Sequence, residues 1–405
     1  MSRFKEKLKF VKAKDIIHIF LFILALPIAL IYKLFRKNLW LVCDNGIEAT
    51  DNGFCLFKYI CENHPEQDCV FAVYKTSVDY ENVKNTGKVV KYGSFKHWIL
   101  YLTAKVNISS QKGGKPNYAV CYLLEVYGIL RNKRVFLQHG VILTDINFLY
   151  YENTKMDMFV TSTYREWEYV NNNYGYPEGV VKMLGLPRFD NLHNFETVKN
   201  QILIMPTWRD WIGTDALAKD PKENKKAFLE SDYYKNWSKI INSKRLADIC
   251  KKHNCTVMFY PHRDMQRFID CFDNDNPYLT ICKYPQYKVQ DLMKSSAFMI
   301  TDYSSVQIDF AYMKKPLAYF QFDYDRFCES HYGKGYFDYT DDGFGPVFNN
   351  EEDIMNYIEK MAVTSFKNTE PYKSRHKEFF NLYDENNSKR NYEAIKERYS
   401  KNKER

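Results

Sequence analysis

A chain of 405 residues, 45% hydrophobic and 17% aromatic, can form one or two globular domains of ordinary size. Its ten cysteines form no C-x-x-C pair, which argues against a disulfide framework or a zinc site and favours reduced thiols in a cytoplasmic setting. The net charge of +8 is concentrated in residues 1–40, where nine Lys and Arg against two acidic residues give +7. The remainder is almost neutral and lacks the basic face that nucleic-acid binding requires, so no nucleic-acid partner is expected.

Residues 1–38 are predicted to be a membrane-associating segment. Residues 16–32 form an apolar run of 17 residues with basic residues on both sides, just short of the ~20 residues of a typical membrane span. The basic residues at 33–37 follow without a small-residue cleavage site, which argues against a signal peptide. A single short span, a buried core helix and a helix lying in the membrane plane remain open. We favour the in-plane helix, with lysines on anionic headgroups, because basic flanks at both ends give a span no orientation.

Residues 39–195 alternate short apolar runs with helical patterns, which predicts parallel strands joined by crossover helices. We expect strands at residues 39–43, 69–74, 88–90, 105–108, 134–138, 157–161 and 180–184. The strand at 134–138 runs directly into His139 and Gly140. Because ligands bind at the carboxyl edge of an open parallel sheet, His139 is placed to act as a base, and Thr144 and Asp145 could orient it or contact a substrate. A lone histidine at such a position is also often purely structural.

A polar segment at residues 191–200 is typical of an interdomain linker, and the α/β pattern restarts over residues 196–365. A helix is predicted at residues 237–253. The charged stretch at 213–232, with Lys219, Lys222, Lys225 and Lys226, resembles a loop or lid. Strands are expected at residues 201–205, 256–260, 297–300 and 317–320, and further helices at 366–405.

Residues 301–305, Thr-Asp-Tyr-Ser-Ser, connect the strand at 297–300 to a helical pattern. Asp302, Ser304 and Ser305 are favourable N-cap residues, and a helix N-terminus with two hydroxyl groups suits a phosphate. The same residues could equally serve only to cap the helix.

Four groups of polar residues follow four predicted strands: His139, Thr207 with Arg209, His262 with Arg263, and the 301–305 turn. Together they predict a cleft between two doubly wound domains. Two arginines and a hydroxylated helix start suit a pyrophosphate, and two histidines suit proton transfer near neutral pH. The chain has no Walker A loop, no G-x-G-x-x-G and no acidic cluster with metal spacing. We therefore expect transfer from a nucleotide-activated donor without a metal or other cofactor.

The stretch TDYSSVQIDFAYMKKPLAYFQFDYDRF, residues 301–327, closely resembles the hallmark of the CDP-glycerol glycerophosphotransferases, the teichoic-acid and capsule polymer synthases. Shorter segments fall in the family's order, namely QHG at 138–140, GLPRFD at 185–190, PTWRD at 206–210 and PHR at 261–263. The resemblance covers roughly residues 100–350. It implies an α/β protein of the GT-B fold, with two Rossmann-like domains facing across a cleft, a nucleotide site mainly in the second, and attachment to the cytoplasmic face of the cell membrane, peripherally or by a single anchor.

The resemblance also implies roles for individual residues. His139 would deprotonate an acceptor hydroxyl for in-line attack on the glycerol-bearing phosphorus of CDP-glycerol, releasing CMP, and His262 would contact the pyrophosphate and stabilise the leaving phosphate. Asp302 would cap the helix and Asp309 would reach the ribose, while Arg209, Ser304 and Ser305 would hold phosphates. The full donor-binding set is Thr207, Arg209, Arg263, Thr301, Asp302, Ser304, Ser305 and Asp309, and the acceptor-side set is Gly140, Thr144 and Asp145.

Two departures from the family pattern leave alternatives open. Family polymerases often read WHGTPLK where residues 138–144 read QHGVILT, which leaves the acceptor open between a lipid-linked saccharide and a growing polymer. Arg263 replaces the usual proline, so CDP-ribitol or another CDP-polyol remains a possible donor. A GT-B glycosyltransferase or epimerase acting on a sugar nucleotide is a second candidate. A non-catalytic membrane protein that binds teichoic-like polymers is a third, but it would have no need for both histidines.

Overall fold

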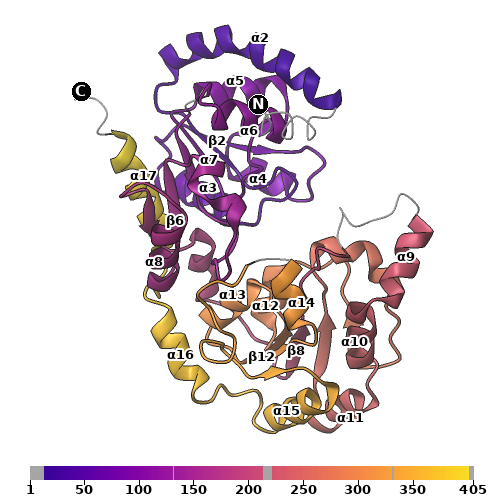
Figure 1. Ribbon diagram of the computed structural model, residues 1–405. Helices are drawn as coiled ribbons and strands as arrows, with labels where there is room; N and C mark the ends of the chain where they lie inside the picture. Colours follow the sequence, from indigo (N-terminus) through magenta and orange to yellow (C-terminus); the bar gives the residue numbers. More distant parts are fainter. Residues whose placement is uncertain (1–12, 131, 213–220, 331–332, 401–405) are drawn as a thin grey trace. The chain divides into compact units, whose positions relative to one another are not determined.

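The computed structural model describes residues 13–130, 132–212, 221–330 and 333–400 (Figure 1). The chain divides into two compact units. The first unit extends to Val141 and also includes Asn147–Asn191 and Leu382–Arg405, and the second comprises Ile142–Ile146 and Leu192–Asn381. The main boundary therefore falls after residue 191, where the sequence suggested 195, and the expected C-terminal segment 366–405 is divided between the two units.

A seven-stranded parallel sheet in the order β3-β2-β1-β4-β5-β6-β7 forms the centre of the first unit. Its strands are β1 (Trp40–Cys43), β2 (Cys69–Val73), β3 (Val89–Lys91), β4 (Val106–Ser109), β5 (Arg134–Phe136), β6 (Met158–Thr161) and β7 (Val181–Met183). Its helices include α2 (Ala13–Phe35), α3 (Asn52–Asn63), α4 (Tyr80–Thr86), α5 (Phe95–Thr103), α6 (Tyr118–Val126), α7 (Tyr151–Thr154), α8 (Tyr164–Asn173) and α17 (Asn387–Ser400). All seven predicted strands are present, and their ends differ from the prediction by at most two residues.

Both faces of this first sheet are buried, as its continuous apolar strands require. All four residues of β1 are buried. One buried apolar cluster includes Phe57 of α3 and Tyr392 of α17, and a second includes Leu41 of β1 and Trp98 of α5. Because both faces of the sheet are covered, polar side chains that contact a ligand have to lie at the ends of its strands.

Helix α17 belongs to the first unit because Asp190 holds its N-terminus. The two carboxylate oxygens of Asp190 accept hydrogen bonds from the backbone N–H groups of Asn387 and Ser388, each at 2.8 Å. The first N–H groups of a helix have no partner within the helix, so a carboxylate there satisfies them and interacts favourably with the helix dipole. Asp190 ends the GLPRFD segment, which thus joins the C-terminal helix to the first sheet.

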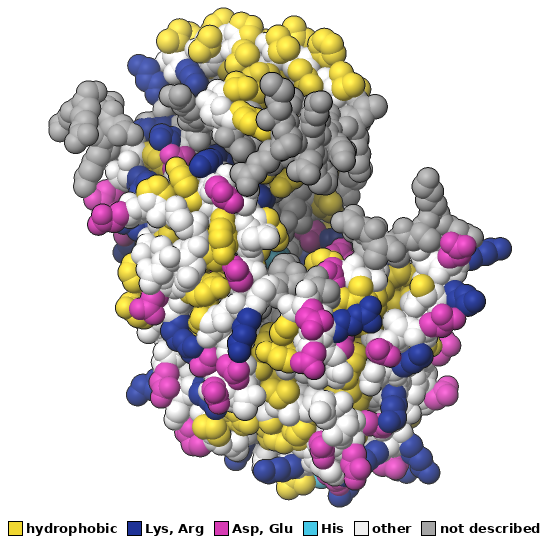
Figure 2. Space-filling model, in the orientation of Figure 1, with side chains coloured by type: hydrophobic (Ala, Val, Ile, Leu, Met, Phe, Trp, Pro, Cys, Tyr) yellow, Lys and Arg dark blue, Asp and Glu magenta, His cyan; other side chains and the backbone are white. Residues whose placement is uncertain are grey.

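Helix α2 lies along α5 (Figure 1). Ala25 and Ala29 are buried against the first unit, and Trp98 Nε1 donates a hydrogen bond to His18 Nδ1 at 3.1 Å. By length and composition, residues 15–35 could cross a membrane. The basic residues expected at 3–12 lie outside the described residues. The outward side of the helix is apolar (Figure 2) and exposes Ile16, Ile17, Phe20, Ile23, Leu24, Leu30, Ile31, Leu34 and Phe35.

The second unit is built on a six-stranded parallel sheet in the order β10-β9-β8-β11-β12-β13. Its strands are β8 (Gln201–Ile204), β9 (Thr256–Phe259), β10 (Leu279–Ile281), β11 (Phe298–Thr301), β12 (Leu317–Phe320) and β13 (Val347–Phe348). Its helices include α9 (Pro221–Glu230), α10 (Asp232–Ile241), α11 (Lys244–His253), α12 (Val289–Ser295), α13 (Val306–Tyr312), α14 (Tyr324–Ser330), α15 (Glu351–Val363) and α16 (Tyr372–Phe379). The four predicted strands are present, and β10 and β13 are additions.

Two predictions in the second unit are wrong. The expected helix at 237–253 is two helices, because the chain breaks at Asn242 and Ser243, two residues that compete with the helix for backbone hydrogen bonds. Asn242 Nδ2 donates to the carbonyl of Asp273 at 2.9 Å. The expected loop at 213–232 is helical over α9, whereas residues 213–220, including Lys219, lie outside the described residues.

Candidate active site

His139 stands just beyond the carboxyl end of β5, on a turn that Gln138 shapes. Gln138 has a φ of 65°, an uncommon backbone conformation for a residue with a side chain. Its amide holds the turn in place by donating to the carbonyl of Val160 at 2.5 Å and to Glu166 Oε1 at 3.0 Å. The imidazole of His139 is 66% exposed. The strained turn therefore presents this side chain to solvent from a buried support.

Asp51 is the partner of His139, and sequence reasoning missed it. Asp51 is the N-cap of α3, and its Oδ2 lies 2.5 Å from His139 Nδ1. Its Oδ1 accepts a hydrogen bond from Arg188 at 3.0 Å, and Arg188 also donates to the carbonyl oxygen of His139. Burial opposes ionisation of Asp51, but His139 and Arg188 outweigh it and lower the pKa of the carboxyl. An ionised Asp51 can only accept, so Nδ1 carries the proton and Nε2 keeps its lone pair.

A second carboxyl group, Asp44, lies beside Asp51 and behaves in the opposite way. Asp44 accepts hydrogen bonds from the N–H of Gly53 at 2.9 Å and from Ser110 Oγ at 2.6 Å. A Cβ atom on Gly53 would lie 2.3 Å from Asp44 Oδ1, so only glycine fits there. Burial and the charge of Asp51 raise the pKa of Asp44 to about 7. Of the two neighbouring carboxyl groups, Asp51 is therefore charged and Asp44 titrates near neutrality.

The acceptor-side residues are divided between the two units. Gly140 is half-buried next to His139 in the first unit, whereas Thr144 and Asp145 belong to the second. The N–H of Asp145 donates to the carbonyl of Gly333 at 2.9 Å. The acceptor role of all three residues stays a prediction.

Asp302 ties together two loops at the carboxyl edge of the second sheet. Its Oδ1 accepts hydrogen bonds from the N–H of Thr207 at 2.8 Å, after β8, and from the N–H of Tyr303 at 2.7 Å, after β11. The prediction that Asp302 caps the following helix is wrong, because Ser305 occupies the N-cap of α13 and its side chain makes no capping bond. Asp302 instead fixes the position of one loop relative to the other.

Arg209 is fully buried between two carboxylates. One of its terminal nitrogens lies 2.9 Å from Asp302 Oδ2, and Nε lies 2.8 Å from Asp323 Oδ2. The pKa of this guanidinium stays far above the physiological range because the two carboxylates outweigh its burial. Contact of Arg209 with a donor phosphate stays a prediction, and its burial favours a supporting role for the loops.

The second histidine has the opposite hydrogen-bond arrangement to His139. His262 follows β9, its side chain is 35% exposed, and its Nδ1 accepts a hydrogen bond from the N–H of Asp264 at 3.2 Å. A neutral imidazole that accepts at Nδ1 carries its proton on Nε2. Arg263 lies over the ring of Tyr284, with the guanidinium carbon 3.9 Å from the ring centroid. His262 can therefore donate a hydrogen bond from Nε2, whereas His139 can accept a proton at Nε2.

The remaining donor-side candidates differ in exposure. Ser305 is half-buried, and Thr207 and Ser304 are 8% and 7% exposed. Thr301 is fully buried and donates to the carbonyl of Met205 at 2.7 Å, and Asp309 is 2% exposed. Burial therefore favours supporting roles for Thr301 and Asp309, and their contact with a donor stays a prediction. Among the described residues, no three His, Cys, Asp or Glu side chains form a group that could hold a metal ion.

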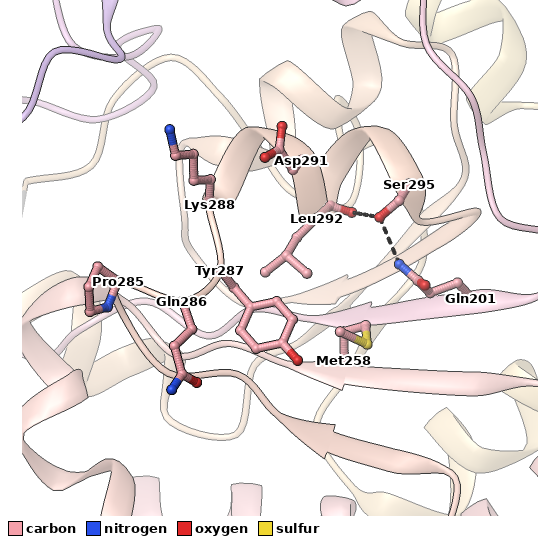
Figure 3. A pocket seen from close by; sticks show the side chains of 9 residues that line it. All are labelled: Gln201, Met258, Pro285, Gln286, Tyr287, Lys288, Asp291, Leu292 and Ser295. Carbon is pink, nitrogen blue, oxygen red and sulfur yellow. Dashed lines mark hydrogen bonds between the residues drawn. The ribbon is translucent and has the colours of Figure 1, made fainter. Parts of the chain in front are cut away.

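A pocket of about 370 Å³ occurs elsewhere in the second unit (Figure 3). It is lined by Tyr287, Lys288 and residues of α12, together with Gln201 at the amino end of β8. Thr207, His262 and Ser304 follow the carboxyl ends of their strands, at the other edge of the same sheet. None of the predicted site residues lines this pocket.

Two parallel sheets with the strand order of doubly wound nucleotide-binding proteins, each with a histidine and polar loops at its carboxyl edge, define an α/β protein of the GT-B fold. The chain belongs to the CDP-glycerol:poly(glycerophosphate) glycerophosphotransferase family, whose model matches residues 24–397.

Three similar proteins illustrate this membership. The minor teichoic acid biosynthesis protein GgaB of Bacillus subtilis (strain 168) is 35% identical over 89% of this chain, which spans only 40% of GgaB. The teichoic acid glycerol-phosphate transferase of Staphylococcus aureus (strain NCTC 8325 / PS 47) is 24% identical, covering 90% of this chain and 95% of that protein. The structure of the wall teichoic acid polymerase TagF has a TM-score of 0.66 at 16% identity, covering 91% of this chain and 90% of that one, which shows the shared fold.

Proposed function

We propose that this protein transfers glycerol phosphate from CDP-glycerol to a hydroxyl group of a membrane-linked saccharide or a growing polyol-phosphate polymer, and releases CMP. Family membership supports the reaction class. The observation that carries the proposal is the contrast between the partners of the two Nδ1 atoms: that of His139 lies 2.5 Å from the Asp51 carboxylate, and that of His262 accepts from the N–H of Asp264 at 3.2 Å. His139 offers a lone pair at Nε2 and His262 offers an N–H at Nε2, as a base and a charge-stabilising donor require.

His139 acts on the acceptor. Its Nε2 takes the proton of the acceptor hydroxyl as the oxygen attacks the glycerol-bearing phosphorus. The new bond joins the acceptor oxygen to that phosphorus, and the bond that breaks joins the phosphorus to the oxygen that leaves with CMP. General-base action of this kind contributes about 10²–10⁴-fold to the rate.

The second unit binds the donor. His262 Nε2 donates to the phosphate that leaves with CMP, and the hydroxyls of Ser304 and Ser305 with the guanidinium of Arg263 contact the pyrophosphate. Arg209 and Asp302 keep the supporting loops in register. Positioning and charge stabilisation supply most of the rate enhancement in phosphoryl transfer.

The test measures CMP release by the purified chain with CDP-glycerol, with and without a lipid-linked saccharide acceptor. CDP-ribitol and a UDP-sugar are the competing donors, and His139→Ala is the variant. Acceptor-dependent release from CDP-glycerol that disappears in the variant supports the proposal. Release from CDP-ribitol alone would keep the mechanism and change the donor. Turnover of the UDP-sugar alone, or full activity of the variant, would overturn it.

We infer that α2 attaches the first unit to the cytoplasmic face of a membrane by lying in the plane of the lipid surface. The helix contacts α5 through Ala25 and Ala29 and is held by Trp98 at His18, so one of its sides is already occupied by protein. Its opposite side is apolar, and the exposed Lys33 and Lys37 at its end suit anionic headgroups, whereas Arg36 is paired with Asp68 at 2.6 Å. A helix with one protein-covered side and one apolar side suits an interface better than a span.

A further inference from the structure

Residues from three segments of the first unit hold the turn that carries His139. Asp51 and Asn52 begin α3, Arg188 belongs to the GLPRFD segment, and Gln138 precedes the histidine. Asn52 Nδ2 donates to the carbonyl of Gln138 at 2.8 Å, and Asn52 Oδ1 accepts from the N–H of Arg188 at 3.0 Å. The Arg188 side chain then reaches both the Asp51 carboxylate and the main-chain carbonyl of His139. The imidazole is thus held at its ring and at its backbone.

We propose that Asp51 and Arg188 are the positioning residues of the catalytic base: Asp51 fixes the Nδ1–H tautomer of His139, and Arg188 holds both the Asp51 carboxylate and the backbone carbonyl of the histidine. This inference rests on the proposed function of His139. It also gives a role to the GLPRFD segment, which the reaction scheme otherwise leaves unused. As His139 accepts a proton and becomes cationic, the Asp51 carboxylate stabilises the charge that forms.

Helix capping alone does not explain these contacts. Asp51 Oδ1 accepts from the N–H of Asn52 at 2.8 Å, a hydrogen bond that Ser, Thr or Asn at the N-cap could also accept. The second oxygen is committed to His139 instead. The Arg188 side chain is only 9% exposed, and burying a guanidinium is costly unless it is paired. A carboxylate paired with arginine on one oxygen and with histidine on the other is the arrangement expected of a base and its orienting group.

The charged surroundings of the base come from several elements of the first unit. Asp44, after β1, faces Asp51, and Cys55 on α3 lies close to both carboxyl groups and to Arg188. Asp190 lies near Cys55, but its oxygens accept hydrogen bonds from the start of α17. Of these carboxyl groups, Asp51 is the one whose oxygen lies 2.5 Å from His139 Nδ1.

The decisive variant is Asp51→Asn, which keeps a good N-cap but removes the charge. We expect kcat for CMP release to fall by about 10²–10⁴-fold, while the Kd for CDP-glycerol changes less than about twofold, because the donor groups lie in the second unit. In ¹⁵N-histidine NMR the His139 proton should move from Nδ1 to Nε2, because Asp51 Oδ1 keeps its donors and the amide NH₂ of the new asparagine then faces Nδ1. Arg188→Lys, which keeps the charge but not the two-partner geometry, should lose less activity than Arg188→Met.

The matched control is Asp157→Asn, which removes a carboxylate that accepts from Lys133 Nζ at 2.9 Å at the amino end of β6 in the same unit. It should leave kcat and the His139 spectrum unchanged. An Asp51→Asn variant with wild-type kcat and an unmoved His139 proton would overturn the inference. If Asp51→Asn does not fold, Arg188→Lys and Arg188→Met test the inference by the same two measurements, kcat for CMP release and the position of the His139 proton. If the wild-type chain releases no CMP from any CDP-polyol, the proposed function fails. The NMR comparison of the His139 tautomer in the wild type and in Asp51→Asn then still tests whether Asp51 positions the histidine.

Discussion

At the scale of single residues, both units use buried ion pairs to hold loops at the ends of strands. Asp51 and Arg188 do so in the first unit, and Arg209 with Asp302 and Asp323 does so in the second. A buried charge is costly to desolvate, and removing one partner leaves the other uncompensated. Such pairs therefore fix geometry strongly while adding little net stability.

The buried arginine of the second unit gives the first prediction. Arg209→Met should destabilise the second unit by about 3–5 kcal/mol, because Asp302 and Asp323 would both remain buried without a cation. Urea unfolding followed by tryptophan fluorescence measures this, since Trp237 is buried in that unit's core. A loss below about 1 kcal/mol would show that the two carboxylates are solvated or protonated at little cost.

Asp44 gives a prediction about pH. Its pKa in the folded protein, about 7, is above the ordinary value of 3.8, so its contribution to stability is fully present at low pH and is lost as the pH rises through 7. Between pH 5 and pH 8 this loss amounts to about 2–3 kcal/mol. Asp44→Asn should remove it, so the variant should lose less stability than the wild type over that interval in urea unfolding. Equal losses in both proteins would contradict the assignment.

At the scale of elements, helices and strands with a clear local pattern were predictable, and contacts between distant segments were not. The strands at 201–205 and 317–320 follow from apolar runs bounded by turn residues, and both are present. Asp51 was missed because it lies 88 residues before His139, and only the sheet order brings the ends of β1 and β5 close together. The available signal was weak, because Asp51 lies before a helix, eight residues beyond the end of the predicted strand at 39–43. Local periodicity cannot supply such a pairing.

Helix α2 provides the prediction at this scale. Replacing Phe20 and Leu24, which are 62% and 60% exposed, with glutamate should weaken binding to vesicles containing anionic lipid by at least about tenfold. Val363→Glu is the matched control, because Val363 is 67% exposed at the end of α15 in the second unit. An in-plane helix should also be released from membranes by alkaline carbonate. Retention after that wash would favour a spanning helix instead.

At the scale of the whole molecule, the two units repeat one plan. In each sheet the first three strands run outward in sequence, and the fourth strand then pairs with the other side of the first. The order is 3-2-1-4-5-6 in the second sheet, and the first sheet has the same order with a seventh strand added. The loops after the first and fourth strands meet at this reversal, the usual ligand position in open α/β sheets. Asp44 and Ser110 occupy it in the first unit and Thr207 and Asp302 in the second. The duplicated plan was visible in the sequence, whereas the hydrogen bonds that join the loops were not.

This division predicts that variants in the two units will have separable kinetic effects. His139→Ala should abolish most CMP release yet bind CDP-glycerol within about twofold of the wild type, because it removes an interaction made only during transfer. The double variant Ser304→Ala, Ser305→Ala should weaken CDP-glycerol binding by about tenfold or more, since hydrogen bonds to charged phosphates contribute about 1.5–3 kcal/mol each. Calorimetric Kd values and the acceptor dependence of CMP release measure the two effects. If His139→Ala lost donor binding and the serine variant kept it, the assignment of base and donor site to separate units would have to be reversed.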